Sequence, residues 1–283
     1  MQSTTLDIGK FDQAIQSWMK TGSNELVEPT AINTIKLVTY NIWFSDEHMS
    51  QRAPAIFEIL HDSGADVIAL QEVTYHFLQL ILMQDWVRKS YYISDFRGDT
   101  FSSYGVVLLF RIPAKRLTLH QLPGNMERQL LVAEFIINDQ ALKVATVHLE
   151  SMKASADVRA EQLNRLFPLL SDANSSVLMG DFNFCSSNED ESSNIDDSYI
   201  DLWDELRTDD FGATLNSDLN PMLTTKCSHR IMARYDKILM RNENQAWQCM
   251  QIDLLGDTAI SRHQPGIFPS DHFAVVAKID CKR

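Results

Sequence analysis

Four short strings in this chain place polar residues of catalytic type at the end of an apolar run. They are IKLVTYN, which ends at Asn41; DVIALQE, which ends at Glu72; SVLMGDFN, which carries Asp181 and Asn183; and PSDHFAVVAKI, in which Asp271 and His272 precede the run. Ionisable groups at the ends of buried strands are costly to desolvate unless they meet partners. Because such groups recur across most of the chain, we expect several strands to deliver them to one rim. Two acids, an amide and a histidine at one rim predict a site for a divalent metal and a phosphate ester.

Glu72 is the residue of these strings that is best placed to hold a metal. A hard cation such as Mg²⁺ prefers carboxylate and water oxygens, and one or two carboxylates commonly hold it together with a substrate phosphate. The alternative is a glutamate that caps the helix expected directly after it. In GDFN, Asp181 and Asn183 would share one face of an extended stretch, so that the aspartate could deprotonate a water and the amide could donate to a phosphate oxygen. The alternative there is an ordinary turn, since Asp and Asn are turn residues.

Two histidines also stand at predicted strand ends. His272 follows Asp271 directly before a strand, and Asp236 in RYDKI precedes another strand. This arrangement predicts a carboxylate–imidazole pair, in which the acid fixes the tautomer and keeps the ring protonated to stabilise charge on a phosphorane oxygen. His148 lies at the end of the run LKVATVHLES. For either histidine, the alternative is a polar side chain that merely has a hydrogen-bond partner.

The elements that must position these residues alternate at first and then become mainly strands. The patterns predict strands over 35–42, 66–73, 104–110, 116–122, 130–137, 142–149, 176–182, 235–240, 249–255 and 272–279, and helices near 53–63, 76–87 and 154–171. This mixture fits a mixed β-sandwich with helices on its outer faces. Phe11, Ile15 and Trp18 have helical spacing, so we expect an N-terminal helical extension over 1–30 that packs on a single catalytic domain over 31–283.

The composition limits the partners. A net charge of −13 argues against strong non-specific binding to long duplex DNA, although much of the acid lies in the segment 188–205 and a small phosphate substrate stays compatible. No apolar run is long enough to span a bilayer and the N-terminus lacks a signal-peptide pattern, so we expect an intracellular protein without membrane association. The four cysteines show no CxxC spacing, which argues against a zinc site or a disulfide framework.

Taken together, these strings resemble those of the endonuclease/exonuclease/phosphatase superfamily of Mg²⁺-dependent phosphodiesterases, over roughly residues 35–279. The resemblance implies a fold of class α/β, a four-layer αββα sandwich of two mixed β-sheets flanked by helices. It also implies Mg²⁺ as cofactor, with Mn²⁺ as a substitute. Within the superfamily, the strings VHLES, YIDLWDEL and FPSDH are most similar to the tyrosyl-DNA phosphodiesterases.

Carried over by position, the resemblance implies a metal site and a base. Glu72 would ligate Mg²⁺, with Asn41 and Asp271 as the further ligands that shape the metal and phosphate pocket. Asp181 would activate the attacking water, assisted by Asn183.

The remaining implied roles concern the phosphate and the substrate. His272 and His148 would bind and polarise the scissile phosphate, with Asp236 orienting His272. Basic residues suited to contact substrate phosphates are few, chiefly Arg128, Lys153, Arg230 and Arg234.

Two departures from that family lie in its substrate groove. Cys185 stands where the family tends to have an arginine, and no tryptophan occurs between Thr214 and Arg230. Hydrolysis is therefore better supported than tyrosyl-DNA specificity.

The leading hypothesis is a phosphodiesterase that acts on nucleic-acid ends, above all DNA 5′ termini carrying a tyrosyl or peptide adduct. The alternatives are another superfamily activity (abasic-site endonuclease, RNA exonuclease, or lipid or sugar phosphatase) and an inactive module that binds nucleic-acid ends. We expect a monomer in the nucleus, the cytoplasm or both.

Overall fold

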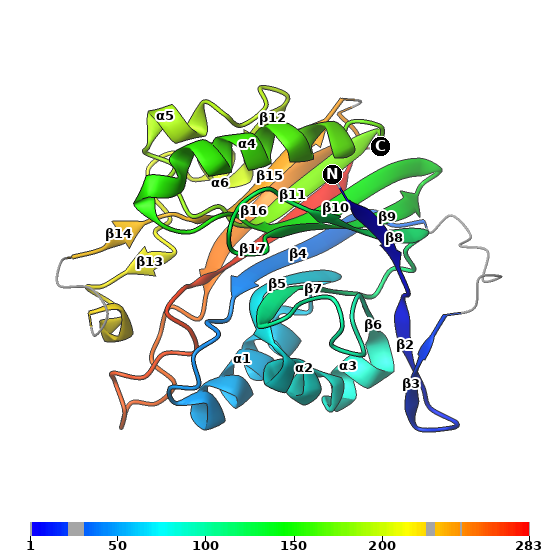
Figure 1. The fold of residues 1–283 in the computed structure, drawn as a ribbon, viewed down its shortest axis with the longest axis horizontal. Helices are drawn as coiled ribbons and strands as arrows, with labels where there is room; N and C mark the ends of the chain where they lie inside the picture. Colours follow the sequence, from blue (N-terminus) through cyan, green and yellow to red (C-terminus); the bar gives the residue numbers. More distant parts are fainter. Residues whose placement is uncertain (1, 22–30, 225–229, 244, 283) are drawn as a thin grey trace.

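Two mixed β-sheets lie face to face at the centre of the protein, whose structure is a computed structural model (Figure 1). It describes residues 2–21, 31–224, 230–243 and 245–282. Sheet A has seven strands in the order β1-β8-β9-β10-β11-β15-β12, and sheet B has eight in the order β16-β17-β4-β5-β7-β6-β2-β3. The strands of sheet A are β1 (Ser3–Leu6), β8 (Arg116–Gln121), β9 (Gln129–Ile137), β10 (Gln140–His148), β11 (Ser175–Asp181), β15 (Asp236–Asn242) and β12 (Tyr199–Asp201). The strands of sheet B are β16 (Trp247–Leu255), β17 (Ala274–Cys281), β4 (Thr34–Asn41), β5 (Val67–Thr74), β7 (Tyr104–Phe110), β6 (Tyr92–Ile93), β2 (Gly9–Asp12) and β3 (Ser17–Lys20). A separate ribbon pairs β13 (Leu215–Asn216) with β14 (Met232–Ala233).

Helices cover both outer faces of this sandwich (Figure 1). They are α1 (Met49–Ser63), α2 (Tyr75–Leu82) and α3 (Asp85–Ser90) on the side of sheet B, and α4 (Ala156–Leu166) and α5 (Glu189–Ser192) on the other side. The short helix α6 (Leu202–Leu206) instead packs at the edge, where its Leu202 and Trp203 join the core between the sheets. Short 3₁₀ turns lie at η1 (Lys153–Ser155), η2 (Phe167–Leu169) and η3 (Pro221–Leu223). One apolar core lies between the sheets, a second lies under α1 and α2, and a third lies under α4. The expected four-layer αββα sandwich of two mixed sheets is therefore confirmed.

Each sheet contains one parallel pair at its centre. β4 runs parallel to β5, and β10 runs parallel to β11, whereas the other pairings in both sheets are antiparallel. Parallel neighbours bring their carboxyl ends to the same sheet edge, and an antiparallel neighbour brings its amino end there. The sheet topology therefore places the strand ends that carry the polar residues at the same edge.

The expected N-terminal helix is wrong. Residues 9–20 form the hairpin β2–β3, in which Phe11 and Trp18 are cross-strand partners with ring centroids 5.6 Å apart. A spacing of seven residues places two side chains on one helical face, but a tight hairpin places them opposite each other equally well. Asp12 decides for the turn, because its carboxylate accepts the backbone N–H groups of Ala14 and Ile15.

The N-terminal segment belongs to the sandwich instead of forming a separate helical unit. β1 pairs with β8 of sheet A and β2 pairs with β6 of sheet B, so the segment runs down one side of the molecule from one sheet to the other (Figure 1). The domain boundary at residue 31 stays a prediction, because residues 22–30 lie outside the described ranges.

The remaining expectations about elements hold with altered limits. The helix expected near 76–87 is divided into α2 and α3, and the one near 154–171 is α4 followed by η2, where Pro168 prevents continuation. Cys185, Cys249 and Cys281 are free thiols, and Cys227 lies outside the described residues. Within the described ranges, no helix has the length and apolarity needed to cross a membrane.

Candidate active site

Strand alternation delivers the polar side chains to the space between the sheets. In β4, Ile35 and Leu37 lie in the core between the sheets, whereas Val38 and Tyr40 lie in the core under α1. Successive side chains of a strand point to opposite faces, so Asn41 falls on the inner face with Ile35 and Leu37. The same parity applies in sheet A, where residues of the inner core precede or follow the polar ones by steps of two: Val144 and His148 in β10, Met179 and Asp181 in β11, and Ile238 and Asp236 in β15. The site is the polar end of the central core.

Glu72 reaches this site only because β5 departs from regular alternation. By parity its side chain would face the helices, as Leu70 does. The register of β5 against β7 shifts between Leu70 and Val73, and Glu72 has a left-handed φ of 61°. A bulge of this kind re-aims a side chain. Gln71, the preceding residue, instead bridges the sheets by hydrogen bonds to Thr39 and Thr146.

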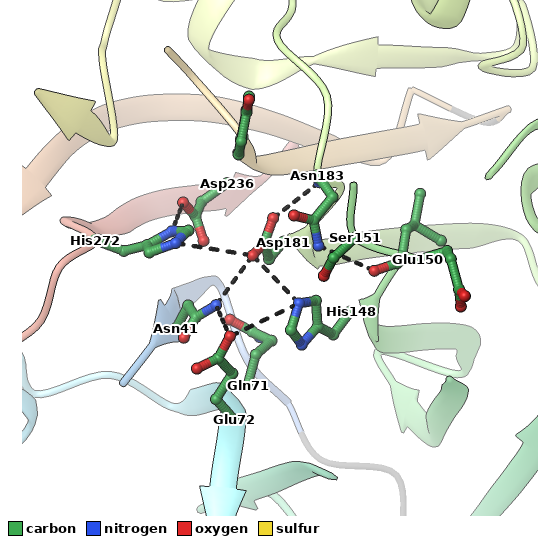
Figure 2. A network of polar contacts seen from close by, with 12 residues as sticks. Asn41, Gln71, Glu72, His148, Glu150, Ser151, Asp181, Asn183, Asp236 and His272 are labelled. Carbon is green, nitrogen blue, oxygen red and sulfur yellow. Dashed lines mark hydrogen bonds and ion pairs between the residues drawn. The ribbon is translucent and has the colours of Figure 1, made fainter. Parts of the chain in front are cut away.

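Asp181 lies at the centre of the polar network (Figure 2). Its Oδ1 accepts the backbone N–H of Asn183 at 2.8 Å, and its Oδ2 accepts Nδ2 of Asn41 at 3.0 Å. The Nε2 atoms of His148 and His272 lie 3.5 Å and 4.0 Å from the same Oδ2. A carboxylate with this setting is 1% exposed and is suited to accept a proton from a water that binds beside it.

The GDFN string is not extended as expected. Asn183 has a left-handed φ of 55°, and its side chain donates to the carbonyl oxygen of Leu149 at 3.0 Å, which fixes the loop after β10. The glycine is required for strand contact, because a Cβ at Gly180 would lie 1.9 Å from the carbonyl oxygen of Val147. Asn183 therefore holds Asp181 in place by a turn and does not share its strand face.

His272 and Asp236 form the predicted carboxylate–imidazole pair. Nδ1 of His272 lies 2.8 Å from Oδ2 of Asp236, so the ring presents Nε2 toward Asp181. Burial by itself lowers the pKa of His272, but the charges of Asp236, Asp181 and Asp271 and the hydrogen bond to Asp236 raise it well above 6.5. The ring is therefore a buried cation next to the central carboxylate.

His148 has the opposite character. Arg128, which has only donor groups, contacts Nδ1 of His148 at 2.9 Å, so this nitrogen must accept and the ring proton resides on Nε2. Burial lowers the pKa of His148 to about 3, with the Arg128 charge acting in the same direction and Asp181 against it. The two histidines thus present the site with one cationic and one neutral N–H donor.

A buried arginine that the sequence analysis did not single out fixes two loops of the site. Arg52 of α1 is 0% exposed and donates to five backbone carbonyl oxygens. Those oxygens belong to Ile42, Trp43, Ser45, Glu47 and Pro269. Ser270 adds a link between the loops through its hydroxyl, which donates to the carbonyl oxygen of Asn41 at 2.7 Å. One sequence signal was present, because Arg52 occupies the apolar stripe of α1 formed by Met49, Ala53, Ile56 and Leu60.

The carboxylate oxygens of Glu72 and Asp271 are suited to bind a hard divalent cation. Burial, followed by the charge of Asp271, raises the pKa of Glu72, while the N–H of Phe44 opposes the shift. Two buried acids that repel each other form the setting in which a divalent cation stabilises both. Asp181, Asp236 and His272 also lie within 4.8 Å of one another by their ligand atoms, and a hydrogen bond joins Asp236 and His272 in this cluster.

Asn41 does not present a ligand oxygen in this structure. Its Oδ1 accepts the backbone N–H of Trp43 at 3.0 Å, so its NH₂ group points between Glu72 and Asp181. In this structure Asn41 donates to both acids, and its role as a metal ligand stays a prediction.

The four basic residues predicted to contact substrate phosphates have different surroundings in the structure. Arg128 lies in the site and contacts His148 and Ser151. Lys153 is exposed on η1, two residues after Ser151 in the sequence. Arg234 is buried and paired with Asp201 at 2.6 Å and Asp204 at 2.5 Å, so it serves the packing of β12 and α6 and the prediction of a substrate contact is wrong. Arg230 is exposed and paired with Asp218.

Comparison with known proteins assigns the class. A sequence model described as the endonuclease/exonuclease/phosphatase family matches residues 38–272, and the chain belongs to this family. Its members are hydrolases of phosphoester bonds, in agreement with the site geometry.

Similar curated proteins share one name. The chain is 26% identical over 251 residues to tyrosyl-DNA phosphodiesterase 2 of Xenopus laevis, covering 86% of this chain and 66% of the relative. It is 23% identical over 289 residues to tyrosyl-DNA phosphodiesterase 2 of Homo sapiens, covering 98% and 76%. The fold is similar to that of D. rerio tyrosyl-DNA phosphodiesterase 2 in complex with a single-strand DNA product, with a TM-score of 0.72 at 20% identity over 87% of this chain and 99% of the other.

Proposed function

We propose that this chain hydrolyses the 5′-phosphotyrosyl ester that joins a tyrosyl or peptide adduct to a DNA end, in a Mg²⁺-dependent reaction. The observation that carries the proposal is the position of Asp181, which faces two histidine N–H donors beside the acids Glu72 and Asp271. The names of the relatives support this substrate class.

In this proposal Asp181 is the general base. Its Oδ2 is near Nε2 of both His148 and His272, so a water bound between these groups would lie within reach of the carboxylate. Asn183 and Asn41 hold the carboxylate by their hydrogen bonds and do not themselves transfer a proton.

The histidines stabilise charge on the phosphate. His272 supplies an imidazolium kept protonated by Asp236, and His148 supplies a neutral Nε2–H whose tautomer Arg128 fixes. Donors pre-positioned for charge that develops in the transition state are commonly the largest contribution to catalysis. Arg128 is also placed to contact the substrate beside His148.

Glu72 and Asp271 would hold Mg²⁺, or Mn²⁺ in its place. The bound ion would act as a Lewis acid that offsets charge on the phosphate oxygens. A tyrosyl leaving group has a pKa of about 10, so it needs less help from a general acid than a sugar alkoxide does.

The second candidate is hydrolysis of a small phosphodiester by the same residues. The observation that favours it is the scarcity of basic contacts, since the net charge is −13 and Arg234 is buried in ion pairs. Lipid and sugar phosphates belong to this alternative, whereas abasic-site and RNA 3′-end substrates are other superfamily activities that the panel below also tests.

One panel of substrates tests the proposal. The enzyme is assayed on a 5′-phosphotyrosyl oligonucleotide, an abasic duplex, a plain 3′ end and bis(4-nitrophenyl) phosphate, each with Mg²⁺ or with EDTA. The proposal predicts that kcat/KM with Mg²⁺ is highest for the first substrate. Turnover of the aryl diester alone, or turnover that persists in excess EDTA, would contradict it. A monomer in the nucleus, the cytoplasm or both is consistent with this substrate and stays a prediction.

A further inference from the structure

Phe44 is an exposed aromatic residue directly beside the catalytic residues. Its side chain is 46% exposed, and its backbone N–H donates to Oε2 of Glu72 at 2.9 Å. Its ring lies parallel to that of Tyr104, with centroids 4.9 Å apart and planes 8° apart. Tyr104 in turn lies 6.3 Å from the ring of His148. An exposed, oriented ring thus borders the site.

The loop that carries Phe44 is held rigidly. Arg52 donates to the carbonyl oxygens of Trp43 and Ser45, the residues on either side of Phe44. Trp43 has a left-handed φ of 58°, a conformation that persists only where the surroundings enforce it. Tyr104 stacks on one face of the Phe44 ring, and 46% of Phe44 stays exposed. A large apolar surface held in one orientation at a site rim is suited to binding a flat ligand group.

We propose that Phe44, supported by Tyr104, stacks on the nucleobase adjacent to the scissile phosphate. This inference rests on the proposed function and names how that site holds its nucleic acid. Every base has a π face, so stacking grips a strand end without reading its sequence.

Stacking also accounts for binding by an acidic protein. The net charge is −13, and the predicted basic contacts that lie near the site are Arg128 and Lys153. Few phosphates can be neutralised by so few cations, so the affinity should depend weakly on salt. A stacked base releases no counterions and adds affinity that salt does not screen.

The test is a double-mutant cycle on binding. Two single-stranded 5′-phosphorylated oligonucleotides, one with thymine and one with a tetrahydrofuran abasic unit at the first position, are titrated by fluorescence anisotropy in EDTA. For the unaltered protein, loss of the base should weaken binding about 5- to 150-fold, the ratio that corresponds to about 1–3 kcal/mol for base–aromatic stacking. In Phe44→Ala the two oligonucleotides should bind within about threefold of each other, and Phe44→Trp should restore the difference.

Controls separate this inference from the proposed function. Met250→Ala removes a comparably exposed apolar side chain, 52% exposed on the edge strand β16, and should retain the full base dependence. The log–log salt slope of binding should be the same in Phe44→Ala as in the unaltered protein. A base effect that survives Phe44→Ala overturns the inference, and so does a loss of kcat/KM on bis(4-nitrophenyl) phosphate equal to that on the oligonucleotide, since the ring would then serve the aryl group. Because binding is measured without hydrolysis, absence of phosphotyrosyl turnover refutes only the proposed function.

Discussion

Asp181→Asn is the most informative single change, because it preserves the shape of the central side chain and removes its charge and basicity. Oδ1 accepts the N–H of Asn183 and Oδ2 accepts Nδ2 of Asn41. An amide has one oxygen, so in either orientation its NH₂ group must face a donor. If this NH₂ group takes the place of Oδ2, it faces two other donors, the NH₂ of Asn41 and the Nε2–H of His148, and no hydrogen bond can form between them.

The magnitude follows from these contacts. Loss of a general base lowers kcat by about 10² to 10⁴. Loss of hydrogen bonds to a charged acceptor costs about 1.5–3 kcal/mol each, and part of this appears as lower stability, because the contacts exist in the free enzyme. We therefore expect kcat to fall by at least about 100-fold, with KM changed by less than about threefold and a lower but measurable Tm.

The assay is steady-state hydrolysis of the 5′-phosphotyrosyl oligonucleotide with Mg²⁺, together with thermal unfolding of both proteins. Asp190→Asn, at an exposed position of α5, is the matched control and should behave like the unaltered protein. If kcat for Asp181→Asn falls less than about tenfold, Asp181 is a structural turn residue and the assignment of the base is wrong.

Three further outcomes are expected. Glu72→Ala should abolish turnover and the Tm increase produced by Mg²⁺ while the protein stays folded, because the change removes an acid that repels Asp271 and leaves no unpaired buried charge; near-normal activity would exclude Glu72 as a metal residue. Arg52→Met should destabilise the protein by about 3–5 kcal/mol in urea unfolding, since five carbonyl oxygens lose their donor; a loss below about 1 kcal/mol would show that water replaces the guanidinium. For His148, the folded-state pKa of about 3 is below the unfolded value of 6.5. The stabilisation of the folded state by the neutral buried ring is therefore complete above pH 6.5 and is lost as the pH falls toward 3. In metal-free protein, His148→Gln should therefore flatten the stability profile between pH 6.5 and pH 3, and an unchanged slope would contradict the buried neutral ring.

The sequence alone was sufficient to predict that polar strand ends from distant segments meet at one site. Asn41, Glu72, Asp181 and His272 stand at the ends of apolar runs, and a desolvated strand end tolerates such groups only where they meet. The topology confirms this, because the parallel pairs and their antiparallel neighbours place those ends at one edge. For Asn41 and Asp181 local pattern and global fold agree, since strand parity is a property of the chain itself.

Other features could not be derived from local pattern. The spacing of Phe11 and Trp18 satisfies both a helix and a hairpin, and the turn at Asp12 together with the pairing of β2 with β6 gives the hairpin. Arg234 looks like a free cation in the sequence, but the acids that bind it, Asp201 and Asp204, come from a segment about thirty residues away.

The orientation of the candidate catalytic side chains was also decided by tertiary structure. By strand alternation Glu72 would face the helices, and only the bulge in β5, against the regular strand β7, turns it into the site. Arg128 fixes the tautomer of His148 and Asp236 the charge of His272, although the two rings are chemically identical in the sequence. Residue types and their parity along a strand are local properties that the sequence determines, whereas bulges, buried ion pairs and protonation states depend on distant groups and therefore exist only in the folded chain.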